Sequence, residues 1–220
     1  MSETCENCGT KITSPGMLSD GNPRYPEETI ARFNAATGQS IVELCRRCGP
    51  DVITAARMEL TVELEKYQGI VDANVQVFPM TTTDHLPAAA RWLVRGLVTA
   101  NVAVGTGILN ELSQGLTDLL GATTTTSGMA LKVNKGEAAA RAILYRKALA
   151  MDANFVIGVD LDYGTTVNNA ATVNMQGTAI WVENLEAVLA PEQIEDVNAF
   201  LQFHKDAVRL TEKLTSLPNA

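Results

Sequence analysis

The sequence ALAMDANFVIGVDLDYGTTV, residues 148–167, decides the fold of the larger part of this chain. Its first half ends a helix predicted over Lys135–Ala153, in which apolar residues recur every three or four positions and face inward: Ala139, Ile143, Leu144, Ala148 and Met151. Its second half begins a strand at Asn154. A further strand is predicted over Thr172–Glu183, and the loop between the two strands is short enough for an antiparallel hairpin.

The residues before this helix carry further strand and helix patterns. VQVFPMTTT (75–83) and WLVRGLVTANVAV (92–104) are rich in residue types that favour strands. TGILNELSQGLTDLLGA (106–122) carries leucine and isoleucine at helical spacing, and ATTTTSGM (122–129) is predicted to be a loop.

Strand geometry divides the residues of VIGVDLDY (156–163) between two faces. One face is predicted to be apolar and carries Ile157, Val159, Leu161 and Tyr163. The other face carries Gly158, Asp160 and Asp162. The two carboxylates could hold a hard cation or line the inner surface of a ring, and they could equally form the solvated face of a sheet that is buried on one side.

These patterns resemble the YbjQ-like family of small bacterial proteins, which is often labelled heavy-metal-binding. The resemblance rests on the opening stretch, on NMQGTAIWV (174–182), and on TTT (81–83) followed by GLVT (96–99). It implies an α+β fold over residues 75–183, with an antiparallel sheet and helices on one face. It also implies a homo-oligomeric ring, a pentamer or a multiple of five, and brings no enzymatic activity with it. The segment contains no cysteine and one histidine, His85, which is a poor ligand set for soft metals.

All four cysteines of the chain lie in its first quarter: Cys5, Cys8, Cys45 and Cys48. They form two CxxC units, TCENCGTK and ELCRRCGPD, and each unit is followed by a glycine. A tight turn of this kind directs both sulfurs toward one point, and Gly9 or Gly49 would allow the backbone to take a positive φ beneath them.

Two such knuckles complete a tetrahedral site of four thiolates, for which Zn²⁺ is the default ion in a reducing compartment and iron the chemical competitor. Four unrelated or redox-active thiols are the alternative, but two CxxCG units in one chain favour a metal site. Four thiolates leave no open coordination position, so the site is predicted to be structural. Residues 1–50 are therefore predicted to form a zinc ribbon, in which SIVEL (40–44) is a strand leading to the second knuckle. The segment has few large apolar residues and should need its metal to fold.

A helix on each side of the YbjQ-like segment completes the predicted organisation. The first, residues 51–69, begins after Pro50 and ends at a C-cap, Gly69, with an apolar stripe of Val52, Ala56, Leu60, Leu64 and Tyr67. It is expected to connect the ribbon to the main domain. The second, residues 190–217, begins near Pro191 and has a stripe of Ile194, Val197, Leu201, His204 or Lys205, and Val208.

Composition narrows the classes of function. The formal net charge of −8 argues against broad binding to nucleic acids or anionic membranes. No apolar run is long enough to span a bilayer, and the polar N-terminal residues lack the apolar region of a signal peptide, so a cytoplasmic protein is expected.

The sequence thus predicts a non-enzymatic binding or scaffold protein that displays zinc ribbons from a homo-oligomeric ring, with a protein partner for the ribbon. A second hypothesis is a regulatory protein that binds nucleic acid through the ribbon, with Lys11, Arg46 and Arg47 on phosphate; the nearly neutral charge of the ribbon gives it little support. A third is a ring that binds a small molecule or a metal ion, or acts on one, near Asp160 and Asp162.

Overall fold

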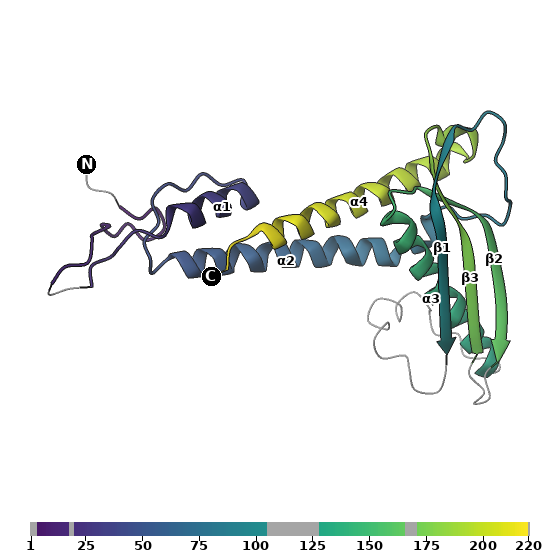
Figure 1. Cartoon of the computed structure of the whole chain (residues 1–220), viewed down its shortest axis with the longest axis horizontal. Helices are drawn as coiled ribbons and strands as arrows, with labels where there is room; N and C mark the ends of the chain where they lie inside the picture. Colours follow the sequence, from purple (N-terminus) through teal and green to yellow (C-terminus); the bar gives the residue numbers. More distant parts are fainter. Residues whose placement is uncertain (1–3, 18–19, 105–127, 166–170, 220) are drawn as a thin grey trace. The chain divides into compact units, whose positions relative to one another are not determined.

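The computed structural model describes residues 4–17, 20–104, 128–165 and 171–219. The described chain is α+β, with four α-helices, three strands and two short 3₁₀-helices (Figure 1). It divides into two compact units, Met1–Gln68 with Lys205–Ala220, and Gly69–His204. No described helix combines the length and the apolar character that crossing a bilayer would require.

The first unit contains helix α1 (Glu27–Thr37), most of helix α2 (Gly49–Ala73) and the end of helix α4 (Pro191–Ser216). Their apolar faces share a core of Phe33, Ala36, Ile53, Ala56, Leu60, Leu210 and Leu217. The stripe predicted on α2 contributes to this core, since Val52, Leu64 and Tyr67 also pack against it. Burial of one face of α2 therefore stabilises the helix far more than its intrinsic propensity does.

Three features of this unit differ from expectation. Helix α1 was not predicted; it ends at Gly38, which takes the left-handed φ of 76° that glycine allows. The predicted strand at residues 40–44 forms no ladder in the described part of the chain, although an isolated bridge pairs Arg24 with Cys45 next to it. The predicted C-cap at Gly69 is wrong, because α2 continues to Ala73. Just after this end, the Asn74 side chain donates a hydrogen bond to the carbonyl of Ile70 at 2.8 Å.

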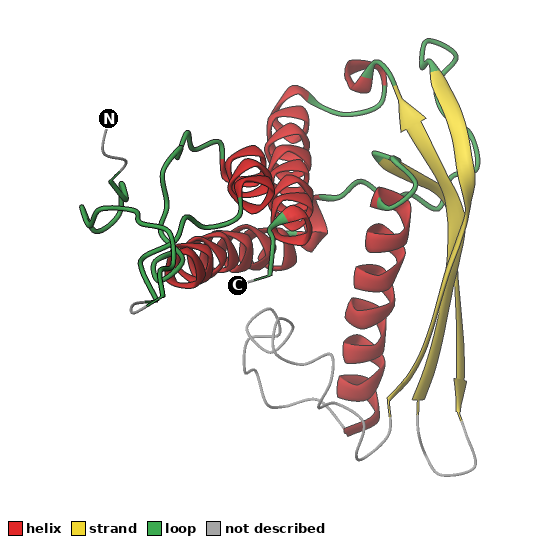
Figure 2. Ribbon diagram, turned by 60° about the vertical axis from the view of Figure 1, so that its left-hand side comes forward, coloured by secondary structure: helices red, strands yellow, loops and turns green. Residues whose placement is uncertain are grey.

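The second unit is built on a three-stranded antiparallel sheet in the order β1-β3-β2. The strands are β1 (Trp92–Val104), β2 (Phe155–Thr165) and β3 (Ala171–Val182), and the predicted β2–β3 hairpin is confirmed. Helix α3 (Gly128–Leu149) runs along one face of the sheet, as Figure 2 shows. The core between them includes Val98, Ala140, Leu144, Val156, Val173 and Ala179. The α+β fold with an antiparallel sheet is therefore confirmed.

A bulge in β2 changes the predicted alternation. The register with β3 shifts between Ile157 and Asp160, and Gly158 takes a φ of +61°. The extra residue moves Ile157 to the face opposite Val159, so the prediction that the two share a face is wrong. Ile157 instead packs with Phe155, Ile180, Val182, Leu185 and Val197 in a second cluster, to which the 3₁₀-helix η2 (Leu185–Ala187) and the start of α4 contribute.

The chain before β1 borders the same bulge. Residues 75–83, predicted as a strand, begin with the 3₁₀-helix η1 (Val75–Val77). Only their second half is extended along β2: Met80 bridges Val156 in parallel, and the Gly158 N–H donates to the Thr83 carbonyl at 2.7 Å. The TTT sequence therefore borders the first half of β2, on the side away from β3.

Helix ends account for the remaining differences. Helix α3 begins at Gly128 rather than at Lys135, and it ends before Met151, whose side chain is exposed rather than inward-facing. On α4, Ala207 and not Val208 is buried. The helix predicted over residues 106–122 lies outside the described residues.

Candidate metal centre

The first cysteine knuckle is a closed turn. The Gly9 N–H donates to the Cys5 carbonyl at 2.8 Å, and the Cys5 N–H donates to the Thr10 carbonyl at 2.9 Å. Gly9 has the predicted positive φ, 67°. An antiparallel bridge between Thr4 and Lys11 closes the turn below the two sulfurs.

The second knuckle leads directly into helix α2. The N–H groups of Cys48 and Gly49 both donate to the Cys45 carbonyl at 3.1 Å, and the Val52 N–H donates to the Cys48 carbonyl. The prediction of a positive φ at Gly49 is wrong, because Gly49 is the first residue of α2. Glycine is needed there for a different reason: a Cβ would lie 2.2 Å from the Tyr25 ring.

The carboxylate of Glu6, which the sequence analysis did not identify, connects the first knuckle to the residues just before the second knuckle by hydrogen bonds. One oxygen of Glu6, between Cys5 and Cys8, accepts hydrogen bonds from the N–H groups of Val42 and Glu43, both at 2.9 Å. The Glu6 N–H in turn donates to the Glu43 carbonyl at 2.8 Å. The hydrogen bonds from the Glu43 and Val42 backbone lower the pKa of Glu6. The sequence signal that could have predicted these hydrogen bonds is the presence of an acidic residue inside a CxxC unit.

These contacts bring all four sulfurs together, with every Sγ within 4.8 Å of the others. The Sγ atoms of Cys8 and Cys45 are 3.9 Å apart, and the Cys45 N–H points at Cys5 Sγ from 3.3 Å. A tetrahedral ion with metal–sulfur bonds of about 2.3 Å would place its ligands about 3.8 Å apart. Both the donor set and its spacing therefore fit a thiophilic metal ion.

The thiols differ in how readily they ionise. Hydrogen bonds with Thr10 lower the pKa of Cys8 to about 6. Burial raises the pKa of Cys45, but hydrogen bonds with Cys48 and its backbone outweigh that effect and leave the pKa below its ordinary value. A hydrogen bond with Asn7 lowers the pKa of Cys48, yet burial and the neighbouring sulfurs raise it to about 12. The neighbouring sulfurs thus oppose the ionisation of Cys48, and a divalent cation would remove that opposition.

Comparison with known proteins concerns a different part of the chain. Residues 78–183 match the family described as "Putative heavy-metal-binding". A "UPF0145 protein" of Anoxybacillus flavithermus is 31% identical over 101 residues, which cover 46% of this chain and 94% of that protein. The chain belongs to this YbjQ-like family. A "UPF0145 protein" of Trichodesmium erythraeum is 34% identical over 86 residues, 39% of this chain and 78% of its own length.

A solved structure of a DUF74-family protein of unknown function from Pediococcus pentosaceus aligns with 47% of this chain and with 96% of its own chain, at 17% identity and a TM-score of 0.28.

The residues that match the family, 78–183, contain none of the four cysteines. The family description therefore does not refer to the thiol cluster, which belongs to the part of the chain outside the match.

The two aspartates of the YbjQ-like segment do share one face of β2. Each begins a polar row across the sheet. Asp160 on β2 pairs with Gln176 on β3, which pairs with Thr99 on β1, and Asp162 is followed in the same way by Asn174 and Asn101. Gln176 donates to Asp160 at 3.4 Å, and both carboxylates are exposed. Within the described ranges, the cysteine cluster is the one place where three or more potential metal ligands converge.

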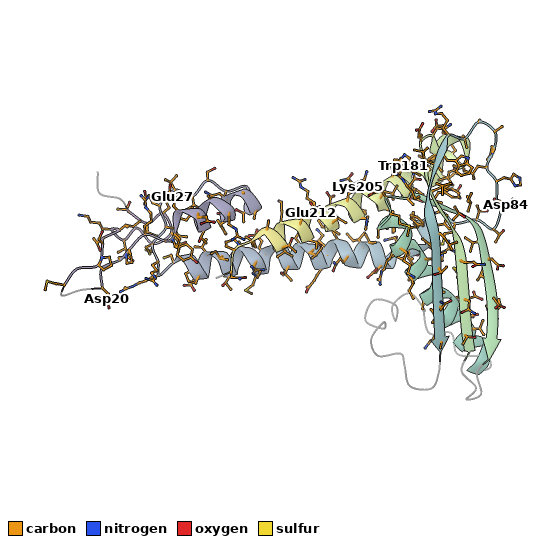
Figure 3. All side chains as sticks on the ribbon, viewed as in Figure 1. Asp20, Glu27, Asp84, Trp181, Lys205 and Glu212 are labelled. Atoms are coloured by element: carbon orange, nitrogen blue, oxygen red, sulfur yellow. The ribbon has the colours of Figure 1, made fainter. Side chains whose placement is uncertain are left out.

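The other predicted contact residues are at the surface. Lys11 belongs to the first knuckle, and Arg46 and Arg47 to the second, and all three are exposed. The histidine of the YbjQ-like segment, His85, contacts Asp84 at 2.8 Å and lowers the pKa of that carboxyl. Asp84 lies in the exposed segment before β1 (Figure 3).

Proposed function

We propose that this chain is a non-enzymatic scaffold whose N-terminal residues are held together by a structural Zn²⁺ ion on Cys5, Cys8, Cys45 and Cys48. The observation that carries the proposal is the convergence of the four sulfurs within 4.8 Å. Four thiolates fill the coordination sphere of Zn²⁺ and leave no position for a substrate, which favours a structural role over a catalytic one.

The packing around the sulfurs supports a folding role for the ion. Cys5 and Cys45 are buried against Ile30 and Leu44, and this small cluster shares Tyr25, Ile41 and Val52 with the core formed by α1, α2 and α4. A metal that fixes the knuckles would therefore also stabilise the start of α2.

Elemental analysis of the purified protein tests the metal. One zinc per chain is the expected result; iron, or no metal, would overturn the zinc assignment. Replacing any one of the four cysteines by serine should release the ion and unfold the N-terminal residues, while the circular-dichroism signal of the YbjQ-like sheet persists. A serine variant that keeps its full zinc content would show that the replaced cysteine is not a ligand.

We place a self-association surface on strand β1. It is an edge strand of the described sheet, so one row of its N–H and C=O groups is not used by the β1–β3 ladder. Leu93, Val94 and Leu97 of this strand are 56%, 63% and 67% exposed. Apolar side chains beside a long strand edge favour pairing with another chain.

The family resemblance favours a pentamer or a multiple of five. In such an assembly each ribbon would be presented several times, and a weak contact between one ribbon and a partner protein would become a strong one. Native mass spectrometry counts the subunits. Leu97→Glu should release monomers, whereas Val62→Glu, at an equally exposed position on α2, should leave the subunit count unchanged. A wild-type monomer would overturn the scaffold proposal and leave the metal proposal standing.

A further inference from the structure

Cys8 differs from the other three cysteines in its access to solvent. Cys5 and Cys45 are each 1% exposed and Cys48 is half-buried, whereas Cys8 is exposed. Its neighbour Gly9 is also open, since a Cβ there would meet no atom within 4 Å. Of the four cysteines, Cys8 is therefore the residue most accessible to a small reactive molecule from solvent.

The sulfur of Cys8 has a buried partner at short range. Its distance to Cys45 Sγ is 3.9 Å, and a disulfide requires about 2.0 Å. The two residues belong to different knuckles, so a bond between them would use one sulfur from each half of the proposed metal site. Cys8 is the exposed member, and rotation of its side chain can supply much of the approach.

We propose that Cys8 is a site of oxidation by peroxides, that Cys45 resolves the oxidised sulfur, and that the resulting Cys8–Cys45 disulfide releases the metal. This inference rests on the proposed metal site. The family match does not extend to these residues, and the chemistry follows from the arrangement of the sulfurs alone.

The reaction consumes one peroxide and two thiolates. The Cys8 thiolate attacks one oxygen of hydrogen peroxide, the O–O bond breaks, hydroxide leaves, and Cys8 becomes a sulfenic acid. The Cys45 thiolate then attacks the Cys8 sulfur, the S–O bond breaks, and a second hydroxide leaves as the S–S bond forms. Two electrons pass from the two sulfurs to the peroxide. Cys5 and Cys48 remain, and two thiolates hold Zn²⁺ much less tightly than four. A dithiol reductant reverses the step.

Trypsin makes the disulfide easy to locate. Cys5 and Cys8 share the peptide 1–11, while cleavage after Arg46 and Arg47 places Cys45 in peptide 33–46 and Cys48 in peptide 48–57. Treatment of the zinc-loaded full chain with hydrogen peroxide should join peptide 1–11 to 33–46, with fragment ions assigning the bond to Cys8. Zinc release, followed with a chromogenic chelator, should rise together with this linked peptide and reverse with dithiothreitol.

Two histidine variants separate the role of Cys8 from a general loss of the site, because histidine is itself a zinc ligand. Each is compared at equal zinc content. Cys8→His should lose zinc to peroxide roughly tenfold more slowly than wild type, because the exposed sulfur is gone. Cys48→His keeps both reacting sulfurs and should still give the peptide pair 1–11 and 33–46 joined through Cys8 and Cys45, whereas Cys8→His should give no such pair.

Other outcomes decide against the proposal. Equal rates of zinc release from wild type and Cys8→His, or a disulfide that joins a different pair, would overturn it. If the purified chain carries no metal, the metal proposal fails, and peptide mapping of the peroxide-treated chain still decides whether Cys8 pairs with Cys45.

Discussion

Arg57 on helix α2 donates a hydrogen bond to the carbonyl of Pro218, 3.1 Å away and next to the end of the described chain. Its second terminal nitrogen lies 3.5 Å from the Leu214 carbonyl in the last turn of α4. One guanidinium thus binds carbonyl groups that the end of α4 leaves without helical partners. This contact fixes the C-terminal residues to the same helix that begins at the second cysteine knuckle.

Replacing Arg57 by alanine should therefore destabilise the first unit. The Pro218 carbonyl belongs to a buried residue and would lose its partner, at a cost of about 1–2 kcal/mol. Urea denaturation, followed by the helical circular-dichroism signal, measures the change. Arg209→Ala, at an exposed position of α4, is the matched control and should change stability little. Equal effects from the two variants would show that Arg57 does not fix the C-terminus.

Metal removal should act on one unit and spare the other. The thiol cluster shares Tyr25, Ile41 and Val52 with the helical core of the first unit, so loss of the ion should weaken the start of α2 and the end of α4. Hydrogen exchange before and after chelation should show lost protection at residues 44–56 and 207–217. Protection in β3 should stay unchanged. Equal losses in both regions would show that the sheet also depends on the metal.

The two glycines of α2 should respond to alanine in opposite directions. At Gly49 a Cβ would lie 2.2 Å from the Tyr25 ring. The ring would have to move away from the buried cluster around Cys5 and Cys45, at a cost of about 1–3 kcal/mol. At Gly69 a Cβ meets no atom within 4 Å, and alanine in a helix interior is favoured over glycine by about 0.5–1 kcal/mol. Thermal unfolding of the zinc-loaded variants measures both effects. A neutral Gly49→Ala would show that the Tyr25 ring moves freely.

The sequence patterns predicted the helices and strands better than the irregularities within them and the contacts between distant residues. Apolar spacing found α2, α3, α4 and the β2–β3 hairpin, because burial of one face dominates each of them. The CxxC spacing found all four thiols of the candidate site. The bulge at Gly158 escaped notice because a strand glycine signals several different irregularities. The Glu6 contacts were also missed, since they join residues about 36 positions apart in the chain.

Burial of His204 predicts a pH dependence of stability. Burial lowers the pKa of His204 below its ordinary value of 6.5, and the charge of Asp152 opposes this effect only in part. The unfolded chain therefore binds this proton more readily than the folded chain. The stability contributed by neutral His204 is complete above the unfolded pKa and decreases as the pH falls below it. In His204→Gln, the free energy of unfolding should fall less between pH 7 and pH 5.5 than in wild type; an unchanged slope would contradict the assignment.

Asn154 joins β2 to β3 through a reciprocal pair of hydrogen bonds. Its side chain is 2% exposed, donates to the Val182 carbonyl at 2.8 Å and accepts from the Val182 N–H at 2.7 Å. Asn154→Ala would leave a buried donor and a buried acceptor unpaired at the end of the hairpin, which should cost about 2–4 kcal/mol. Asn174→Ala removes the same side chain from the exposed face of β3 and should cost far less. Urea unfolding of both variants makes the comparison. Because this contact lies inside the YbjQ-like sheet, Asn154→Ala should destabilise the sheet without reducing the zinc content, and parallel loss of both would refute the independence of the two units.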